Sequence, residues 1–269
     1  MKVVDTDISN FKILRLGDSS MNKGEVELIE LEECPKNLDM IVGFPDVGLV
    51  GVIASSFLVR RLEMKTIAYM DSSMFPPVLP FHKSRPHFPL RISTDGNLVV
   101  LFSEIAVPVK SYGAIAETIM EYAIRNEAKS IIMLGGIAVQ NRIEIVKPSV
   151  YILPTKEELL KEIKLPELKS LDEGFLAGIY AVLMKEMMKR NLKGYVLLAE
   201  SHLGYPDPGA AASVLEVLSR LLNLDIDIKP LLEQEEELRL HLRDLMKRTV
   251  ETLRSAQKTY EQTPPLLYR

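Results

Sequence analysis

The sequence predicts an α/β fold, with a mostly parallel sheet flanked by helices. Short apolar runs rich in β-branched residues alternate with helical patterns of twelve or more residues, and this alternation is typical of βαβ units. Apolar residues make up 47% of the chain and charged residues 26%, which excludes bulk disorder. The 269 residues allow one large domain, or a domain with an appendage, that needs no disulfide to hold its core.

Six strands and four helices are expected along the first 222 residues. The strands are 25–32, 39–44, 65–70, 98–103, 130–134 and 194–199, and the helices are 47–62, 111–126, 174–190 and 208–222. Asp46 and Asp207 suit the N-cap of the helices that follow them, because a carboxylate accepts hydrogen bonds from the first free amides. Pro208 suits the first helical position. Segments 71–91, with five prolines, and 141–172 are expected to be irregular.

The character of the sequence changes at Pro230, so we divide the chain into an α/β core of residues 1–229, a charged helix of residues 230–258 and a tail of residues 259–269. In the helix, Leu238, Leu242 and Leu245 repeat at the spacing of a coiled-coil seam. Two interpretations stay open. The helix stands off the body as a spacer or docks on another subunit, or it folds back on its own domain as an ordinary amphipathic helix.

The tail ends in an apolar and aromatic tip, which is unusual because chain termini are generally polar. Two prolines stiffen it as an extended segment. Its last residues are Pro264, Pro265, Leu266, Leu267, Tyr268 and Arg269. We expect such a tip to be received by a partner, or by the domain itself.

Charge and cysteine content narrow the function classes. The 33 basic and 37 acidic residues give a net charge of −4, which argues against a general affinity for nucleic acid. A single cysteine, Cys34, excludes an internal disulfide and favours a small packing residue in a reducing cytosol. No apolar run approaches the roughly 20 residues of a membrane helix, and the N-terminus lacks the apolar core of a signal peptide. The expected location is the cytoplasm, with no membrane partner.

The most tempting motif for chemistry is the glycine-rich segment 43–51, GFPDVGLVG. Its spacing, GxxxxGxxG, matches neither the dinucleotide fingerprint nor a phosphate loop. Asp46 would also place a negative charge where a phosphate has to bind. We therefore interpret Gly48 and Gly51 as residues that let the helix lie close to the sheet, and keep nucleotide binding as the alternative.

An enzyme is the competing interpretation. Asp71, Glu104 and Glu200 lie at the carboxyl ends of predicted strands, as does the pair at 135–136 (GG). That edge binds ligands in open α/β sheets, and carboxylates there are suited to acid–base work on a small molecule or nucleotide. The four histidines, at 82, 87, 202 and 241, show no metal-ligand spacing, and no GxSxG motif is present. No catalytic residue, metal or cofactor is assigned.

Four segments together carry a resemblance to a known family: 43–51, 69–77 (YMDSSMFPP), 135–137 (GGI) and 204–212 (GYPDPGAAA). They resemble the proteasome assembly chaperone 2 family, in particular its archaeal homologues, across residues 39–222. The motif residues that match are Gly43, Pro45, Asp46, Gly48, Gly51, Gly204, Pro206, Asp207 and Pro208.

The resemblance implies a nucleoside-phosphorylase-like sandwich without a recognised catalytic site, in a homo-oligomer of four or five copies. The tail is similar to the hydrophobic–Tyr–any-residue motif of proteasome activators, at Leu267, Tyr268 and Arg269. The implied function is a non-enzymatic assembly chaperone or activator that docks its tails into pockets between α subunits of the proteasome core particle. A third interpretation is a scaffold that binds a paralogous chaperone.

Overall fold

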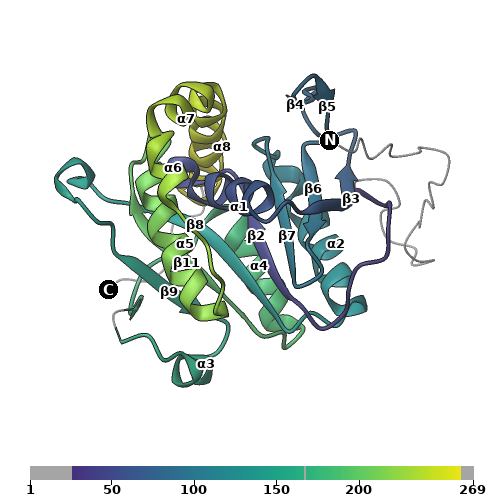
Figure 1. Cartoon of the computed structure of the whole chain (residues 1–269), viewed down its shortest axis with the longest axis horizontal. Coiled ribbons are helices and arrows are strands. Elements are labelled where there is room, and N and C mark those ends of the chain that lie inside the picture. Colours follow the sequence, from purple (N-terminus) through teal and green to yellow (C-terminus); the bar gives the residue numbers. More distant parts are fainter. Residues whose placement is uncertain (1–25, 167, 262–269) are drawn as a thin grey trace.

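The computed structural model describes residues 26–166 and 168–261 (Figure 1). Nine strands form one sheet in the order β1-β3-β6-β7-β2-β8-β11-β9-β10. In chain order the strands are β1 Glu27–Glu30, β2 Asp39–Gly43, β3 Lys65–Asp71, β6 Leu90–Thr94, β7 Leu98–Ser103, β8 Ser130–Ala138, β9 Val150–Pro154, β10 Lys169–Ser170 and β11 Gly194–Ser201. A two-stranded hairpin, β4 Phe81–His82 with β5 Arg85–Pro86, stands apart from the sheet.

The centre of the sheet is parallel. β7, β2, β8 and β11 run in the same direction, and β2 lies between β7 and β8. β1, β3 and β6 add an antiparallel flank on one side, and β9 pairs antiparallel with β11 on the other. The predicted α/β fold is confirmed, with the parallel pairing in the middle. The central strands are buried on both faces, as continuous apolar runs such as 98–102 require.

Helices cover both faces of this sheet (Figure 1). α1 Val50–Arg61 and α5 Pro208–Leu222 contact each other on one face, and α2 Tyr112–Arg125 and α4 Gly178–Lys189 contact each other on the other. Two separate apolar clusters result, one under each helix pair. Such a three-layer arrangement buries the apolar stripe of every helix against the sheet.

Two predicted irregular segments contain strands. The segment 71–91 contains the β4–β5 hairpin and the first residues of β6, and the segment 141–172 contains β9 and β10, so the prediction of loops there is wrong. In β6 the polar residues Arg91, Ser93 and Thr94 are buried, because Arg91 pairs with Glu104 and Ser93 faces Thr66. The polar residues of β6 and the prolines that precede it give no strand pattern, so the sequence did not predict β6. Strand β8 also continues to Ala138 instead of ending at residue 134.

The C-terminal extension is three helices rather than one: α6 Lys229–Glu233, α7 Glu235–His241 and α8 Arg243–Glu261. They fold back on the α1–α5 face, where Leu231 and Met246 are buried, and α8 contacts the 3₁₀ turn η2, Val47–Leu49. Leu238, Leu242 and Leu245 are partly buried against the same cluster. Of the two interpretations left open by the sequence, the structure shows the second, in which the C-terminal helices fold back on their own domain. The buried stripe of α8 runs through Met246 and Thr249 with Val250 beside them, a 3.6-residue period that faces the domain.

Residues 262–269 lie outside the described part of the chain, and so does the predicted tail motif. Among the helices of the described residues, none is both long enough and apolar enough to span a bilayer.

Candidate functional site

The carboxyl ends of β2, β8 and β11 bring the two glycine–proline–aspartate motifs together. The first motif forms the turn between β2 and α1, through Pro45 and η2. Within this turn Gly48 (φ 65°) and Leu49 (φ 53°) are both left-handed. Glycine adopts this conformation at no cost, whereas a leucine does so only when its surroundings hold it there. Leu49 is fully buried, so packing of its side chain maintains the turn.

Asp46 is a buried carboxylate that ties this turn to the neighbouring strand. One oxygen accepts the Gly51 amide of α1 at 3.2 Å, and the other accepts the Gly136 amide of β8 at 2.5 Å. Its predicted place at the start of the helix is right, but its side chain does not form an ordinary N-cap on η2. Burial raises the pKa of Asp46 well above its usual range, against the lowering effect of the two amides.

The backbone amides of this turn bear on the alternative that the turn binds a nucleotide. A phosphate at a helix N-terminus needs free backbone N–H groups and a positive potential. Here the amides of Gly51 and Gly136 already donate to the carboxylate of Asp46. The amides of the turn are therefore occupied by a side chain of the protein itself, and the geometry disfavours phosphate at this position.

The glycines of the turn are required by contact. A Cβ on Gly51 would lie 2.4 Å from the Leu134 carbonyl oxygen, and one on Gly136 would lie 2.3 Å from the Val47 carbonyl oxygen. On Gly48 the nearest atom would be the Ser201 hydroxyl, at 1.9 Å. The interpretation that Gly48 and Gly51 permit close packing of helix on sheet agrees with these distances.

The second motif is built around Asp207, which is fully buried. Its carboxylate caps α5 by accepting the Ala210 amide at 3.0 Å, with Pro208 at the first helical position, as predicted. Arg142, from the 3₁₀ turn η4 (Arg142–Glu144) between β8 and β9, binds both carboxylate oxygens through Nε at 2.7 Å and Nη2 at 2.8 Å. Bidentate pairs of this kind are strong and fix orientation.

Asp207 also joins its motif to the first one. Its backbone amide donates to the Gly48 carbonyl at 2.8 Å, and the Ser201 hydroxyl donates to its side chain at 3.3 Å. The β2–α1 turn, the β8–β9 loop and the β11–α5 loop are thereby connected through one residue, Asp207, by its backbone amide and its carboxylate. Pro206 is buried beside it, while Gly204 stands at the exposed tip of the β11–α5 loop.

Tyr180 of α4 closes the assembly from the opposite face of the sheet. Its hydroxyl accepts the Phe44 amide at 2.8 Å and donates to the Leu134 carbonyl. Full burial and the nearby Asp46 raise the pKa of Tyr180 well above its usual range, so the phenol stays protonated and continues to donate. The Tyr180 hydroxyl thus provides hydrogen-bond partners for the Phe44 amide, directly after β2, and for the Leu134 carbonyl of β8.

The loops that this network fixes carry exposed apolar side chains. Ile143 and Val146 of the β8–β9 loop are 90% and 100% exposed, and Leu203 and Tyr205 of the β11–α5 loop are 59% and 71% exposed. The Tyr205 ring contacts His202 edge to face. A rigid frame that holds apolar groups in solvent is typical of a surface for protein contacts.

The strand-end carboxylates do not come together. Asp71 on β3 and Glu200 on β11 are separated by four intervening strands, or about 24 Å at the usual strand spacing. Glu104 binds Arg91 and, at 2.7 Å, the His82 ring. Glu200 accepts the Ser149 amide and the Tyr151 hydroxyl. These acids hold loops in place, and the paired arrangement that acid–base catalysis needs is not formed between them.

Within the described residues, no three or more His, Cys, Asp or Glu side chains cluster in a way that would hold a metal ion. The rings of His82 and His87 contact each other, with 5.5 Å between their centroids. Burial and neighbouring positive charges lower the pKa of His87.

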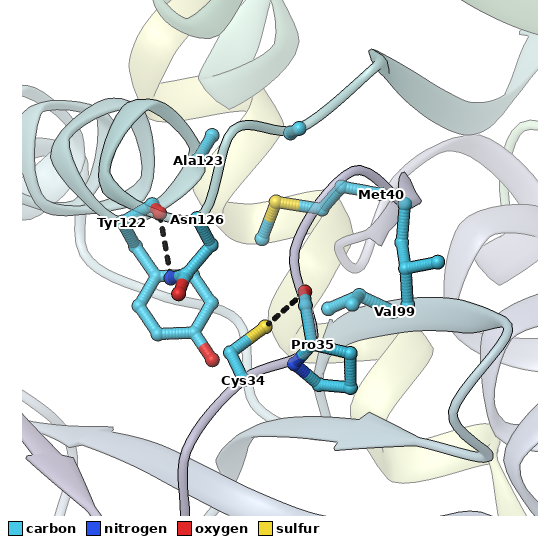
Figure 2. A pocket seen from close by; sticks show the side chains of 9 residues that line it. Cys34, Pro35, Met40, Val99, Tyr122, Ala123 and Asn126 are labelled. Atoms are coloured by element: carbon cyan, nitrogen blue, oxygen red, sulfur yellow. Dashed lines mark hydrogen bonds between the residues drawn. The ribbon is translucent and has the colours of Figure 1, made fainter.

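Cys34 sits in a small cavity between the β1–β2 connection and α2 (Figure 2). Its thiol donates to the Pro35 carbonyl at 3.4 Å and lies against the Tyr122 hydroxyl. The cavity has about 10 Å³, room for one water at most. Burial raises the pKa of Cys34, so the thiol stays protonated and is a poor nucleophile. The interpretation as a packing residue agrees with this environment.

Sequence reasoning missed three residues of this site: Arg142, Ser201 and Tyr180. Arg142 lies 65 residues from Asp207 in a segment without periodicity, so no local signal indicates a buried arginine there. Ser201 and Tyr180 look like ordinary ends of a strand and a helix. Only the Gly48 and Asp207 motifs themselves pointed to the place where these side chains meet.

The fold and the motifs are shared with known proteins. The PAC2 family model matches residues 40–246. PbaA of Pyrococcus furiosus, described as an archaeal homolog of proteasome-assembly chaperone, is 34% identical over 84% of this chain and 98% of its own, with a TM-score of 0.78. An uncharacterized protein of Methanocaldococcus jannaschii, MJ0106, is 28% identical over 90% of this chain and 97% of its own.

PbaB of Pyrococcus furiosus, an archaeal proteasome activator, has the same fold, with a TM-score of 0.70 at 22% identity over 82% of this chain and 99% of its own. The resemblance inferred from the motifs is confirmed by these matches. The chain belongs to the PAC2 family.

Proposed function

We propose that this protein is a non-enzymatic, homo-oligomeric chaperone or activator that acts on the proteasome core particle in the cytoplasm. The observation that carries the proposal is its similarity to PbaA over nearly the whole of that chain. The site supports it, because Asp46, Asp207, Glu104 and Glu200 are all engaged in contacts that hold loops. These loops present Ile143, Val146, Leu203 and Tyr205 to solvent, as suits a protein that binds other proteins.

In the proposed mechanism the C-terminal tail docks in a pocket between neighbouring α subunits of the core particle. The carboxylate of Arg269 pairs with a basic side chain, a charge-assisted contact. Tyr268 supplies a rigid aromatic body and a hydroxyl, and Leu267 fills an apolar hollow. Pro264 and Pro265, with Leu266, limit the conformations that the tail loses on binding.

Several tails on one oligomer strengthen weak single contacts. An extended tail loses entropy when it is ordered, so one tail binds weakly. Linking several on one body raises the effective concentration, and avidity rises by about 10²–10⁴ when the geometry permits simultaneous binding. The homo-oligomer, of four or five copies, is therefore part of the proposed mechanism.

The test is co-sedimentation of the full chain with purified archaeal core particles. Deletion of residues 267–269, or Tyr268→Ala, should reduce binding by about tenfold or more, since avidity multiplies the loss at each tail. Phe81→Ala is the matched control, because Phe81 is an exposed aromatic residue of the β4–β5 hairpin, outside the apolar loops and the tail, and it should leave binding unchanged. Light scattering checks that every variant keeps the wild-type mass. Wild-type binding by the deletion variant would refute the tail mechanism.

A further inference from the structure

We propose that copies of this chain associate head to tail, with an acidic helical face of one copy in a basic groove of the next. The inference rests on the proposed homo-oligomer and assigns its contact surfaces. The basic groove lies at the amino ends of β2, β8 and β11, beside α3 (Glu158–Glu162) and the end of α5. The acidic face is the solvent side of α6 and α7.

The basic groove has a volume of about 430 Å³. Its cationic side chains outnumber its acids by four to two and are Lys129, Lys164, Lys193 and Arg220. Both acids are satisfied locally, since Asp39 accepts the Ser130 hydroxyl at 2.6 Å and Glu162 accepts the Lys193 ammonium at 2.5 Å. The groove thus keeps an excess of positive charge on a chain whose net charge is −4.

Two lysines account for that excess. Lys129 and Lys164 are exposed and form no ion pair with any side chain of the described segments. Between the charges the groove is apolar, lined by Leu159, Ile163, Leu165, Leu221 and Leu222. A partner that fits it presents carboxylates beside aliphatic side chains.

The outer side of α6 and α7 has that composition. Glu233, Glu236 and Glu237 are exposed and likewise make no ion pair within the described residues, while Arg239 has a partner. Leu232 and Leu240 are 43% and 68% exposed on the same two helices. The other leucines of this region, at 231 and 238, are buried or half-buried against the domain, so the exposed pair is left for another molecule.

The two surfaces lie at opposite ends of the molecule, with α7 at one end and α3 at the other (Figure 1). They cannot meet within one chain, but they can meet between copies. A contact between different patches on identical chains repeats head to tail and closes into a ring when the rotation permits. Opposite charges on the two patches also steer the encounter and fix its register. A second copy of this chain is therefore the partner that the surfaces fit.

The experiment reverses the charges on each surface separately and then on both. We would measure the molar mass in solution by size exclusion with light scattering. Lys129→Glu with Lys164→Glu should weaken self-association by about tenfold or more, because like charges then face each other. Glu236→Lys with Glu237→Lys should do the same. Either double variant moves the mass toward the 30.3 kDa of one chain, and the quadruple variant restores the wild-type mass.

Lys110→Glu with Glu121→Lys is the matched control, because both residues are exposed away from the two surfaces; it should keep the wild-type mass. Thermal unfolding confirms that each variant is folded. A wild-type chain of 30.3 kDa at all concentrations would overturn the proposal, as would double variants that assemble normally or a quadruple variant that fails to reassemble. No proteasome is present in this experiment, so its result is separate from the tail test. Tail-dependent binding by an oligomer whose double variants assemble normally keeps the proposed function and rejects these surfaces. A monomeric wild type would reject these surfaces and also the avidity of the proposed mechanism.

Discussion

Two glycines in equivalent positions give a sharp test of the packing at the β2–α1 turn. Gly51 is the second residue of α1, and Gly113 is the second residue of α2. A Cβ on Gly51 would lie 2.4 Å from both the Leu134 carbonyl oxygen and the Tyr180 hydroxyl, whereas one on Gly113 would meet nothing within 4 Å. Alanine at the two positions should therefore have opposite effects on stability.

Gly113→Ala should gain about 0.5–1 kcal/mol, because alanine loses less conformational entropy in a helix. Gly51→Ala should gain the same conformational entropy term but lose more stability through its contacts. Overpacking costs about 1–3 kcal/mol, and displacing Tyr180 from its hydrogen bonds to Phe44 and Leu134 costs about 1 kcal/mol per bond. The net destabilisation is about 2–4 kcal/mol, a fall in Tm of about 4–16 °C for a chain of this size.

Calorimetry of the two variants beside the wild type measures both effects. We expect a rise in Tm of about 1–4 °C for Gly113→Ala and the larger fall for Gly51→Ala. If Gly51→Ala matched the wild type or gained stability like its control, then helix α1 would not need close approach to the sheet, and the reasoning from the glycine contacts would be wrong.

Three further variants test the buried polar groups. Arg142→Met should cost about 3 kcal/mol, because it leaves the buried Asp207 side chain without its main partner. A double variant with Asp207→Leu should cost less than the sum of the two single variants, and additive losses by chemical denaturation would contradict the coupling. Burial raises the pKa of Asp46, so its contribution to folding stability is complete below the unfolded pKa of about 3.9 and declines as pH rises. The stability of wild type relative to Asp46→Asn should therefore fall from pH 4 upward, and a difference that does not change with pH would count against this argument. Tyr180→Phe should cost about 1–3 kcal/mol, while an unchanged melting profile would show that its hydroxyl is dispensable.

Local signals in the sequence were enough for the central strands and the helices around them. The helix after Asp207 begins and ends as predicted, and its start has a local signal, because aspartate favours the N-cap and proline favours the first helical position. The apolar runs at 39–43 and 98–103 became parallel strands because they are buried on both faces. In each case the signal lies within a few residues of the structure it determines.

The missed features depend on partners far along the chain. β6 is a strand because Arg91 finds Glu104 and because β3 and β7 pair on either side. The buried pair of Arg142 and Asp207 has no counterpart in periodicity, since neither neighbourhood reveals the other. The seam of Leu238, Leu242 and Leu245 was compatible with a free helix or a docked one. The apolar surface formed by α5 and the β2–α1 turn decides between the free and the docked helix. That surface exists only after distant segments of the chain have packed together.

The single residue that joins three loops, Asp207, also constrains when the domain can become complete. The β2–α1 turn is synthesised early, but its Gly48 carbonyl receives its hydrogen bond from the amide of residue 207. A nascent chain that has not reached this residue holds Arg142 without its counter-charge, next to strands whose neighbour β11 has only just emerged. Ribosome-bound chains that stop before residue 207 should accordingly stay sensitive to protease in this region, and resistance should appear in one step once α5 has formed. Formation of α5 would thus be the step that completes the hydrogen-bond network among these loops.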